Sequence, residues 1–210
     1  LMFVAPWEQG GEWSDSGISG ISRWLNRVWN LVLESYEMKS EAVAAEKAHR
    51  ELSRITHQTI KRVTNDLERL RLNTMIAALM EFTNYLAKTK EIGVVNDSVW
   101  KESIDALLLL LAPTAPHLAE ELWQQTGHSY SIHNQSWPRW DEALARDEEI
   151  TLVVQINGRL RDRVTVPVSI TEAEAKQLAL ERQRVKTYLE SKEIINIIYV
   201  PPRLINLVVR

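Results

Sequence analysis

The 210-residue sequence contains no cysteine. Disulfides, cysteine nucleophiles and thiolate metal sites are therefore excluded, and the composition fits a reducing compartment. Long apolar runs are also missing, because the longest one, residues 106–113, is far shorter than the roughly 20 residues that span a bilayer. No basic segment followed by an apolar stretch opens the sequence, so no secretory signal is expected. With 45% hydrophobic and 25% charged residues, the composition predicts a globular protein.

Motifs for catalysis are absent as well. The sequence has no glycine-rich phosphate loop and no Gly-x-Ser-x-Gly nucleophile elbow. His128 and His133 lie close together in the chain, but carboxylates at metal-ligand spacing do not accompany them. The sequence therefore predicts no catalytic residues and no metal site.

The charge changes sign along the chain. Residues 1–150 carry 15 basic and 22 acidic side chains, whereas residues 151–210 carry 10 basic and 6 acidic ones. Such a change predicts two units with different surfaces. Because the chain begins with leucine, we also expect it to be part of a longer protein.

The first unit reads as a helical bundle. Apolar residues recur at three- and four-residue spacing, as on one face of a helix, in much of residues 17–125. We expect five helices, at about residues 17–36, 41–70, 73–90, 98–112 and 116–125. The run from Leu107 to Leu111 is apolar on all sides and should be the most buried part. Five consecutive amphipathic helices indicate an antiparallel bundle.

A small α+β module is expected to follow an acidic linker at residues 141–149. Strands are predicted at residues 150–156 and 159–168, joined by Asn157 and Gly158, a pair typical of a type I′ turn. Thr171 and Glu174 have the spacing of a capping box, so a helix should begin there and continue to about residue 190, with a possible break near Arg182. Strands at residues 194–200 and 204–209 complete a ββαββ order.

The pairing within the predicted hairpin leaves two alternatives open. A two-residue turn would place three arginines opposite three aliphatic residues of the first strand. Either a β-bulge shifts the pairing, or the arginine stems cover apolar surface while their charged ends reach a partner.

Two groups of basic residues suggest a polyanionic partner. In the helix at 41–70, cations and a histidine recur at helical spacing, at a pitch that suits a phosphate backbone: Lys47, Arg50, Arg54, His57 and Lys61. The module adds Arg159, Arg161, Arg163, Lys186, Lys192 and Arg203. Nucleic acid is the favoured ligand class, and the alternative is that these charges only face water.

Several segments resemble the class I aminoacyl-tRNA synthetases. Residues 107–123, LLLLLAPTAPHLAEELW, resemble a helix-break-helix signature in the anticodon-binding bundle of the leucine, isoleucine, valine and methionine enzymes. Residues 72–80 resemble the preceding helix, and residues 13–29 resemble the exit from the catalytic body. Residues 154–161, VQINGRLR, with 164–167 and 198–208, resemble the C-terminal module of bacterial-type leucyl-tRNA synthetases. Thr114 and Pro202 depart from the family pattern, which puts in doubt a turn with positive φ at Pro202.

The resemblance implies a mainly α fold, in which an anticodon-binding-type bundle precedes the module. Residues 1–16 would be the exit segment from a missing catalytic body, 17–140 the bundle, 141–149 the linker and 150–210 the module. The parent enzyme would use ATP, with Mg, to attach leucine to its tRNA. The chain itself would bind no cofactor, perform no chemistry and lack the catalytic and editing domains.

The resemblance further implies leucine tRNA and the enzyme's own catalytic domain as partners, a cytoplasmic location and no contact with a membrane. By matching positions, we expect ten residues to contact tRNA: Arg50, Arg54, His57, Lys61, Arg62, Gln155, Asn157, Arg159, Arg161 and Lys186. For Asn157 the alternative is a role in the turn alone. Two other functions remain open: a bundle from the isoleucine, valine or methionine enzyme, or a helical adaptor that binds a protein through an exposed apolar face.

Overall fold

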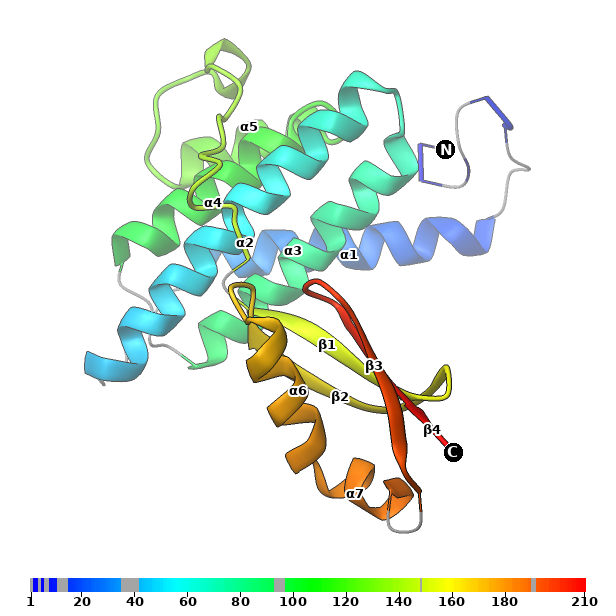
Figure 1. Cartoon of the computed structure of the whole chain (residues 1–210). Helices are drawn as coiled ribbons and strands as arrows, with labels where there is room; N and C mark the ends of the chain where they lie inside the picture. The colour runs from blue at the N-terminus through cyan, green and yellow to red at the C-terminus, as the bar shows by residue number, and fades with distance from the viewer. Residues whose placement is uncertain are drawn as a thin grey trace. The chain divides into compact units, whose positions relative to one another are not determined.

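The computed structural model describes residues 2, 3, 5, 8–10, 15–34, 42–92, 97–147, 149–189 and 192–210. The chain forms two compact units, Leu1–Arg146 and Asp147–Arg210, each with its own hydrophobic core (Figure 1). Half of the expected exit segment, 1–16, lies outside the described residues, as does the expected end of the first helix at residue 36.

The first unit is helical. Its helices are α1 (Asp15–Leu33), α2 (Ala42–Glu68), α3 (Leu72–Ile92), α4 (Asp97–Leu111) and α5 (Pro116–Gln125), followed by a short 3₁₀ helix, η1 (Ile132–Asn134). All five predicted helices are confirmed, with ends that differ by a few residues. Pro116 is the first residue of α5, where its missing N–H costs no helical hydrogen bond.

The core of this unit lies where α2, α3 and α4 pack together. Leu107, Leu108, Leu110 and Leu111 of α4 are fully buried, which confirms the expectation drawn from the apolar run. Leu79 and Phe82 of α3 are among the large side chains buried with them. Burying such side chains is the main favourable term in folding, so α4 anchors the unit.

The second unit is a small α+β module. Its elements are β1 (Glu149–Ile156), β2 (Arg159–Pro167), α6 (Glu172–Glu181), α7 (Gln183–Leu189), β3 (Ile194–Val200) and β4 (Leu204–Val209). The strands form one sheet in the order β2-β1-β4-β3, in which β1 and β4 are parallel and the other pairs antiparallel. The expected single helix is two helices, because Arg182 takes an extended conformation (φ −65°, ψ 125°) at the break that the sequence suggested.

Local signals in the module are confirmed. Asn157 and Gly158 both have positive φ, at 49° and 75°, as a type I′ turn requires. The Thr171 hydroxyl accepts a hydrogen bond from the backbone N–H of Glu174, whose carboxylate accepts from the backbone N–H of Thr171. This capping box satisfies the N–H groups that the first turn of α6 leaves unpaired.

A β-bulge decides the alternative left open by the sequence. Ile156 pairs with Arg159 and Gln155 with Leu160, but the register then shifts, so that Val154 lies opposite Asp162. Arg161 is the extra residue on β2. The shift brings Val164, instead of an arginine, opposite Leu152, so apolar side chains from both strands meet on the helix-covered side of the sheet.

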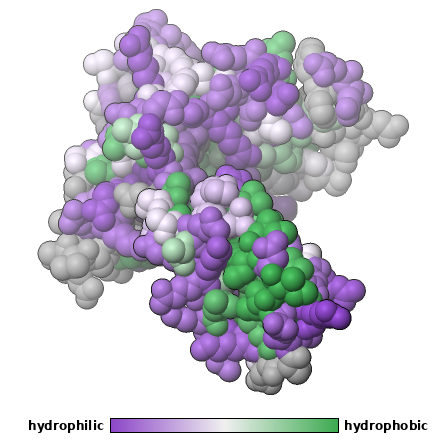
Figure 2. Space-filling model, viewed as in Figure 1, coloured by the Kyte–Doolittle hydropathy of each residue, from purple (hydrophilic) through white to green (hydrophobic). Residues whose placement is uncertain are grey.

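Within residues 149–189 and 192–210, no helix covers the opposite face of the sheet. Apolar side chains gather there on the outer strand β3, where Ile198 and Val200 are about half exposed, and Figure 2 shows a broad hydrophobic surface over this part of the module. The pairing of β3 with β4 places Asn206 beside Ile198, so polar amides interrupt the apolar surface.

Candidate nucleic-acid interface

The predicted cations of α2 follow one side of the helix. Arg50, Arg54, His57 and Lys61 are spaced at three or four residues, whereas Arg62 lies about a quarter turn away. The structure confirms the helical spacing, but it gives these side chains different surroundings. Arg50 and Arg62 are exposed, Arg54 and Lys61 are partly covered, and His57 is buried.

Carboxylates lie beside each of the four cations. Glu46 accepts from Arg50 at 3.0 Å, and Glu51 accepts from Arg54 at 2.6 Å, within α2. Lys61 and Arg62 pair with acids distant in sequence, Glu142 at 2.8 Å and Glu81 at 2.5 Å. Positive and negative side chains therefore alternate along this side of α2, and any anionic ligand would compete with these carboxylates for the same donors.

His57 and two neighbouring residues hold residues 137–146, here called the strap, against α2. The Nδ1 atom of His57 accepts from the backbone N–H of Asp141 at 3.1 Å. The side-chain amide of Gln58 donates to the carbonyl of Ala145 at 2.9 Å. The indole N–H of Trp137 donates to the Thr64 hydroxyl at 2.8 Å. His57 thus uses one ring nitrogen to hold protein backbone.

These contacts bear on the predicted linker at 141–149. Its first half is attached to α2 and belongs to the first unit, which ends at Arg146. The acidic composition predicted a linker. The sequence does not reveal that His57 and Gln58, some 85 residues earlier, bind the backbone of this segment.

In the module, Arg161 is held by an aromatic ring. Its guanidinium carbon lies 4.0 Å from the centroid of the Tyr188 ring, a cation–π arrangement that joins β2 to α7. In the described part of the chain, Arg161 Nε is a buried side-chain nitrogen without a hydrogen-bond partner. The bulge turns this arginine toward the helix side, and the ring limits where its guanidinium can point.

Asp162, next to the bulge, is a residue that sequence reasoning missed. It is buried, and its carboxylate accepts from Arg182 Nε at 2.7 Å and from the backbone N–H of Arg163 at 2.9 Å. The hydrogen bond from Arg182, partly opposed by desolvation and aided by that backbone bond, holds the pKa of Asp162 below its usual value. A lone acid within the basic strand RLRDRV was the available signal.

The other predicted contact residues of the module differ in exposure and in the hydrogen bonds that they already make. The amide of Asn157 donates to the carbonyl of Val209 at 3.0 Å and accepts from its N–H at 2.9 Å, so this side chain joins the turn to β4. Gln155 lies on the sheet face that no helix covers, between Leu160 and Asn206. Arg159 and Lys186 are exposed.

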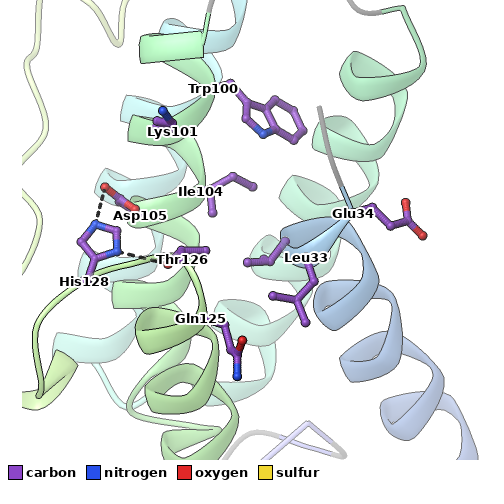
Figure 3. A pocket seen from close by; sticks show the side chains of 10 residues that line it. Leu33, Glu34, Trp100, Lys101, Ile104, Asp105, Gln125, Thr126 and His128 are labelled. Atoms are coloured by element: carbon purple, nitrogen blue, oxygen red, sulfur yellow. Dashed lines mark hydrogen bonds and ion pairs between the residues drawn. The ribbon is translucent and has the colours of Figure 1, made fainter. Parts of the chain in front are cut away.

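A cavity of about 490 Å³ lies elsewhere in the first unit, where the end of α1 meets α4 and the end of α5 (Figure 3). Leu33 lines it from α1, and Trp100 and Ile104 line it from α4. At its rim His128 Nε2 lies 3.3 Å from Asp105 Oδ2, and burial raises the pKa of Asp105 while His128 opposes that rise. The His128 ring also stacks on Trp123, with centroids 3.8 Å apart. None of the ten predicted contact residues lines this cavity.

The described ranges hold neither a metal-binding cluster nor a membrane-spanning helix. Among these residues, no group of three or more histidine, aspartate or glutamate side chains could hold a metal ion. Within the same ranges, no helix has the length and apolar character needed to cross a membrane.

Comparisons with known proteins give one consistent family. Residues 49–177 match the model of the anticodon-binding domain of tRNA ligase. The chain is 56% identical over 210 residues to a leucine–tRNA ligase of Dehalococcoides mccartyi, a match that covers all of this chain and 26% of that protein. It is 51% identical over 209 residues to the leucine–tRNA ligase of Rubrobacter xylanophilus, covering 25% of that protein. The chain thus spans about a quarter of the length of these relatives.

A solved structure agrees with the sequence matches. The crystal structure of a ternary LeuRS–tRNA–LeuAMS complex from Agrobacterium radiobacter K84 matches with a TM-score of 0.77 and 35% identity. The match covers 95% of this chain and 27% of the LeuRS chain. Because the family model covers more than half of the sequence, this chain belongs to the anticodon-binding domain family of tRNA ligases.

Proposed function

We propose that this chain is the tRNA-binding region of a leucine–tRNA ligase. The observation that carries the proposal is that identity to leucine–tRNA ligases extends over the whole chain and so includes both units. This favours the leucine enzyme over the isoleucine, valine and methionine enzymes, and over a helical adaptor. The solved complex of a similar LeuRS contains tRNA.

In this proposal the two units contact the same RNA through phosphate and ribose groups. Contacts of this kind set the position and register of a nucleic acid without reading bases. The bundle would contribute cations of α2, among them Arg54 and Lys61, and the module would contribute Arg159, Arg161 and Lys186. The proposed set is completed by Arg50, His57, Arg62, Gln155 and Asn157. For His57 and Asn157, the hydrogen bonds of their side chains to backbone groups already support a structural role.

The proposal extends to the whole protein. The helices α1–α5 would form the antiparallel bundle of class I synthetases, and the second unit a ββαββ-type module with its helix in two pieces. Attachment of leucine, with ATP and Mg, would take place in a catalytic domain beyond this chain. We propose leucine tRNA as the partner and the cytoplasm as the location.

The test is binding of the chain to leucine tRNA, and to a tRNA without a long variable arm, over a series of salt concentrations. We expect salt-dependent binding that is tighter for leucine tRNA. Arg54→Ala and Arg161→Ala should each weaken binding and reduce the slope of log K against log salt by about one phosphate. Arg23→Ala, on α1 and outside the proposed set, is the matched control and should leave the slope unchanged.

Two results would count against this function. Absence of binding at low salt would remove tRNA as the ligand of the chain. Unchanged affinity and slope in both variants, with wild-type binding intact, would remove the proposed contact residues. Circular dichroism of each variant separates loss of contact from loss of fold, since Arg54 and Arg161 also contact protein groups.

A further inference from the structure

The strap crosses α2 beside the proposed RNA-binding residues (Figure 1). Its backbone and Trp137 are held by three contacts that involve no ion pair, those of Thr64, His57 and Gln58. These contacts are independent of Glu142, which projects from the middle of the strap. A change at Glu142 therefore removes the contact with Lys61 but leaves these three contacts of the strap in place.

The Glu142 carboxylate accepts from two side chains, Lys61 and Trp140, here called the donor pair. Lys61 Nζ lies 2.8 Å from each of its two oxygens, and the indole N–H of Trp140 donates to Oε1 at 2.9 Å. The hydrogen bonds from Lys61 and then Trp140 lower the pKa of Glu142, and the positive charge of Arg146 acts in the same direction. The carboxylate is therefore an anion at neutral pH, and it is bound by two donors, Lys61 and Trp140.

This arrangement resembles an anion site that already holds an anion. A phosphate diester offers the same chemistry as a carboxylate: two oxygens that share one negative charge and accept from lysine and indole N–H groups. The side chains of Lys61 and Glu142 are 41% and 62% exposed, so a ligand from solution can reach the pair. Exposed ion pairs are weak, and a polyanion can therefore replace the internal carboxylate.

We propose that Lys61 and Trp140 form a phosphate-binding site of the RNA interface, and that Glu142 is its internal occupant, displaced by a backbone phosphate when RNA binds. This inference rests on the function proposed above. It adds Trp140 to the contact residues and gives Glu142 the role of an internal competitor for Lys61.

The experiment measures leucine tRNA binding to the complete chain over a salt series. Glu142→Gln keeps an oxygen that can accept from Trp140 but removes the charge that competes for Lys61. We expect about three- to tenfold tighter binding at low salt and a salt slope steeper by about one phosphate. Glu121→Gln removes one charge from an exposed position of α5, where Glu121 accepts a hydrogen bond from the side chain of Gln125, and it should change affinity less than twofold.

A double-mutant cycle tests whether the tighter binding of Glu142→Gln depends on Lys61 of the donor pair. In a Lys61→Ala background, adding Glu142→Gln should give no further gain beyond that of Glu121→Gln. A gain that persists without Lys61, a gain no larger than the Glu121→Gln control, or weaker binding by Glu142→Gln would each overturn the inference. Each of these three outcomes presupposes that the wild-type chain binds tRNA. Absence of wild-type binding would instead overturn the proposed function.

Discussion

At the residue scale, the bulge at Arg161 gives two neighbouring side chains different roles. Arg161 lies over the Tyr188 ring, whereas Asp162 is buried and receives Arg182. An ordinary two-residue hairpin would have placed Arg161 opposite Val154, and the shift places Asp162 there instead. The single acid of the strand thus becomes a buried acceptor between β2 and the break of α6 and α7.

Asp162→Asn should lower the free energy of unfolding of the second unit at neutral pH by about 1–3 kcal/mol, because it weakens charge-assisted hydrogen bonds at a buried position. Since folding lowers the pKa of Asp162, its contribution is present above the ordinary value of 3.8 and is lost as the pH falls through the folded pKa. The difference between the two proteins should therefore shrink below about pH 4. Hydrogen exchange of the β1 and β2 amides measures this difference in the free energy of unfolding.

The matched control is Glu172→Gln at the exposed start of α6, where Glu172 pairs with Lys176. An exposed pair contributes little, so this variant should stay within about 0.5 kcal/mol of the wild type. Equal stability of Asp162→Asn and the wild type at pH 7 would show that the buried carboxylate does not stabilise the module.

At the element scale, α6 depends on the cap at its first turn. It has only ten residues and places Ala175 and Ala179 in the core, so it buries few large side chains. Short helices are marginal without help from their ends. The capping box of Thr171 and Glu174 provides that help.

Thr171→Ala should destabilise the module by about 1 kcal/mol, because the backbone N–H of Glu174 loses its acceptor. Glu174→Gln is the matched comparison: glutamine can still accept from the backbone N–H of Thr171, so the loss should be smaller. Chemical denaturation followed by circular dichroism compares the two variants. If Glu174→Gln were as costly as Thr171→Ala, charge at the helix start, and not the reciprocal cap, would be the stabilising feature.

At the scale of the whole molecule, the two units have separate cores and should unfold separately. Leu107→Ala in α4 should cost the first unit about 2–5 kcal/mol, because it leaves a cavity at a fully buried position. The second unit should be unaffected. Fluorescence can separate the units, since all eight tryptophans lie between residues 7 and 140.

Tryptophan fluorescence should therefore follow the first unit alone, while exchange of the β1–β4 amides follows the second. We expect Leu107→Ala to shift the fluorescence transition only, and Asp162→Asn to shift the exchange of the module only. A shift of both signals by either variant would mean that the units stabilise each other.

Much of the fold was predictable because it depends on local patterns. The five helices followed from apolar residues at helical spacing, and α4 was recognised as the most buried because its leucines leave no polar side. Asn157–Gly158 and Thr171–Glu174 set a turn and a helix start through their own backbone preferences. The predicted contact residues were found by charge and by resemblance, and their contact with RNA stays a prediction.

What the tertiary structure decided depends on residues far apart in the sequence. The sequence by itself determined the helices, the strands and the distribution of charge, since each arises within a few neighbouring residues. Only the fold placed Glu142 on Lys61, 81 residues away, and buried His57 beneath the strap. It likewise set the bulge that separates Arg161 from Asp162, because a register is chosen by the apolar face of the whole sheet. Tertiary packing therefore decides which charged side chains are exposed to solvent, and local sequence patterns do not predict it.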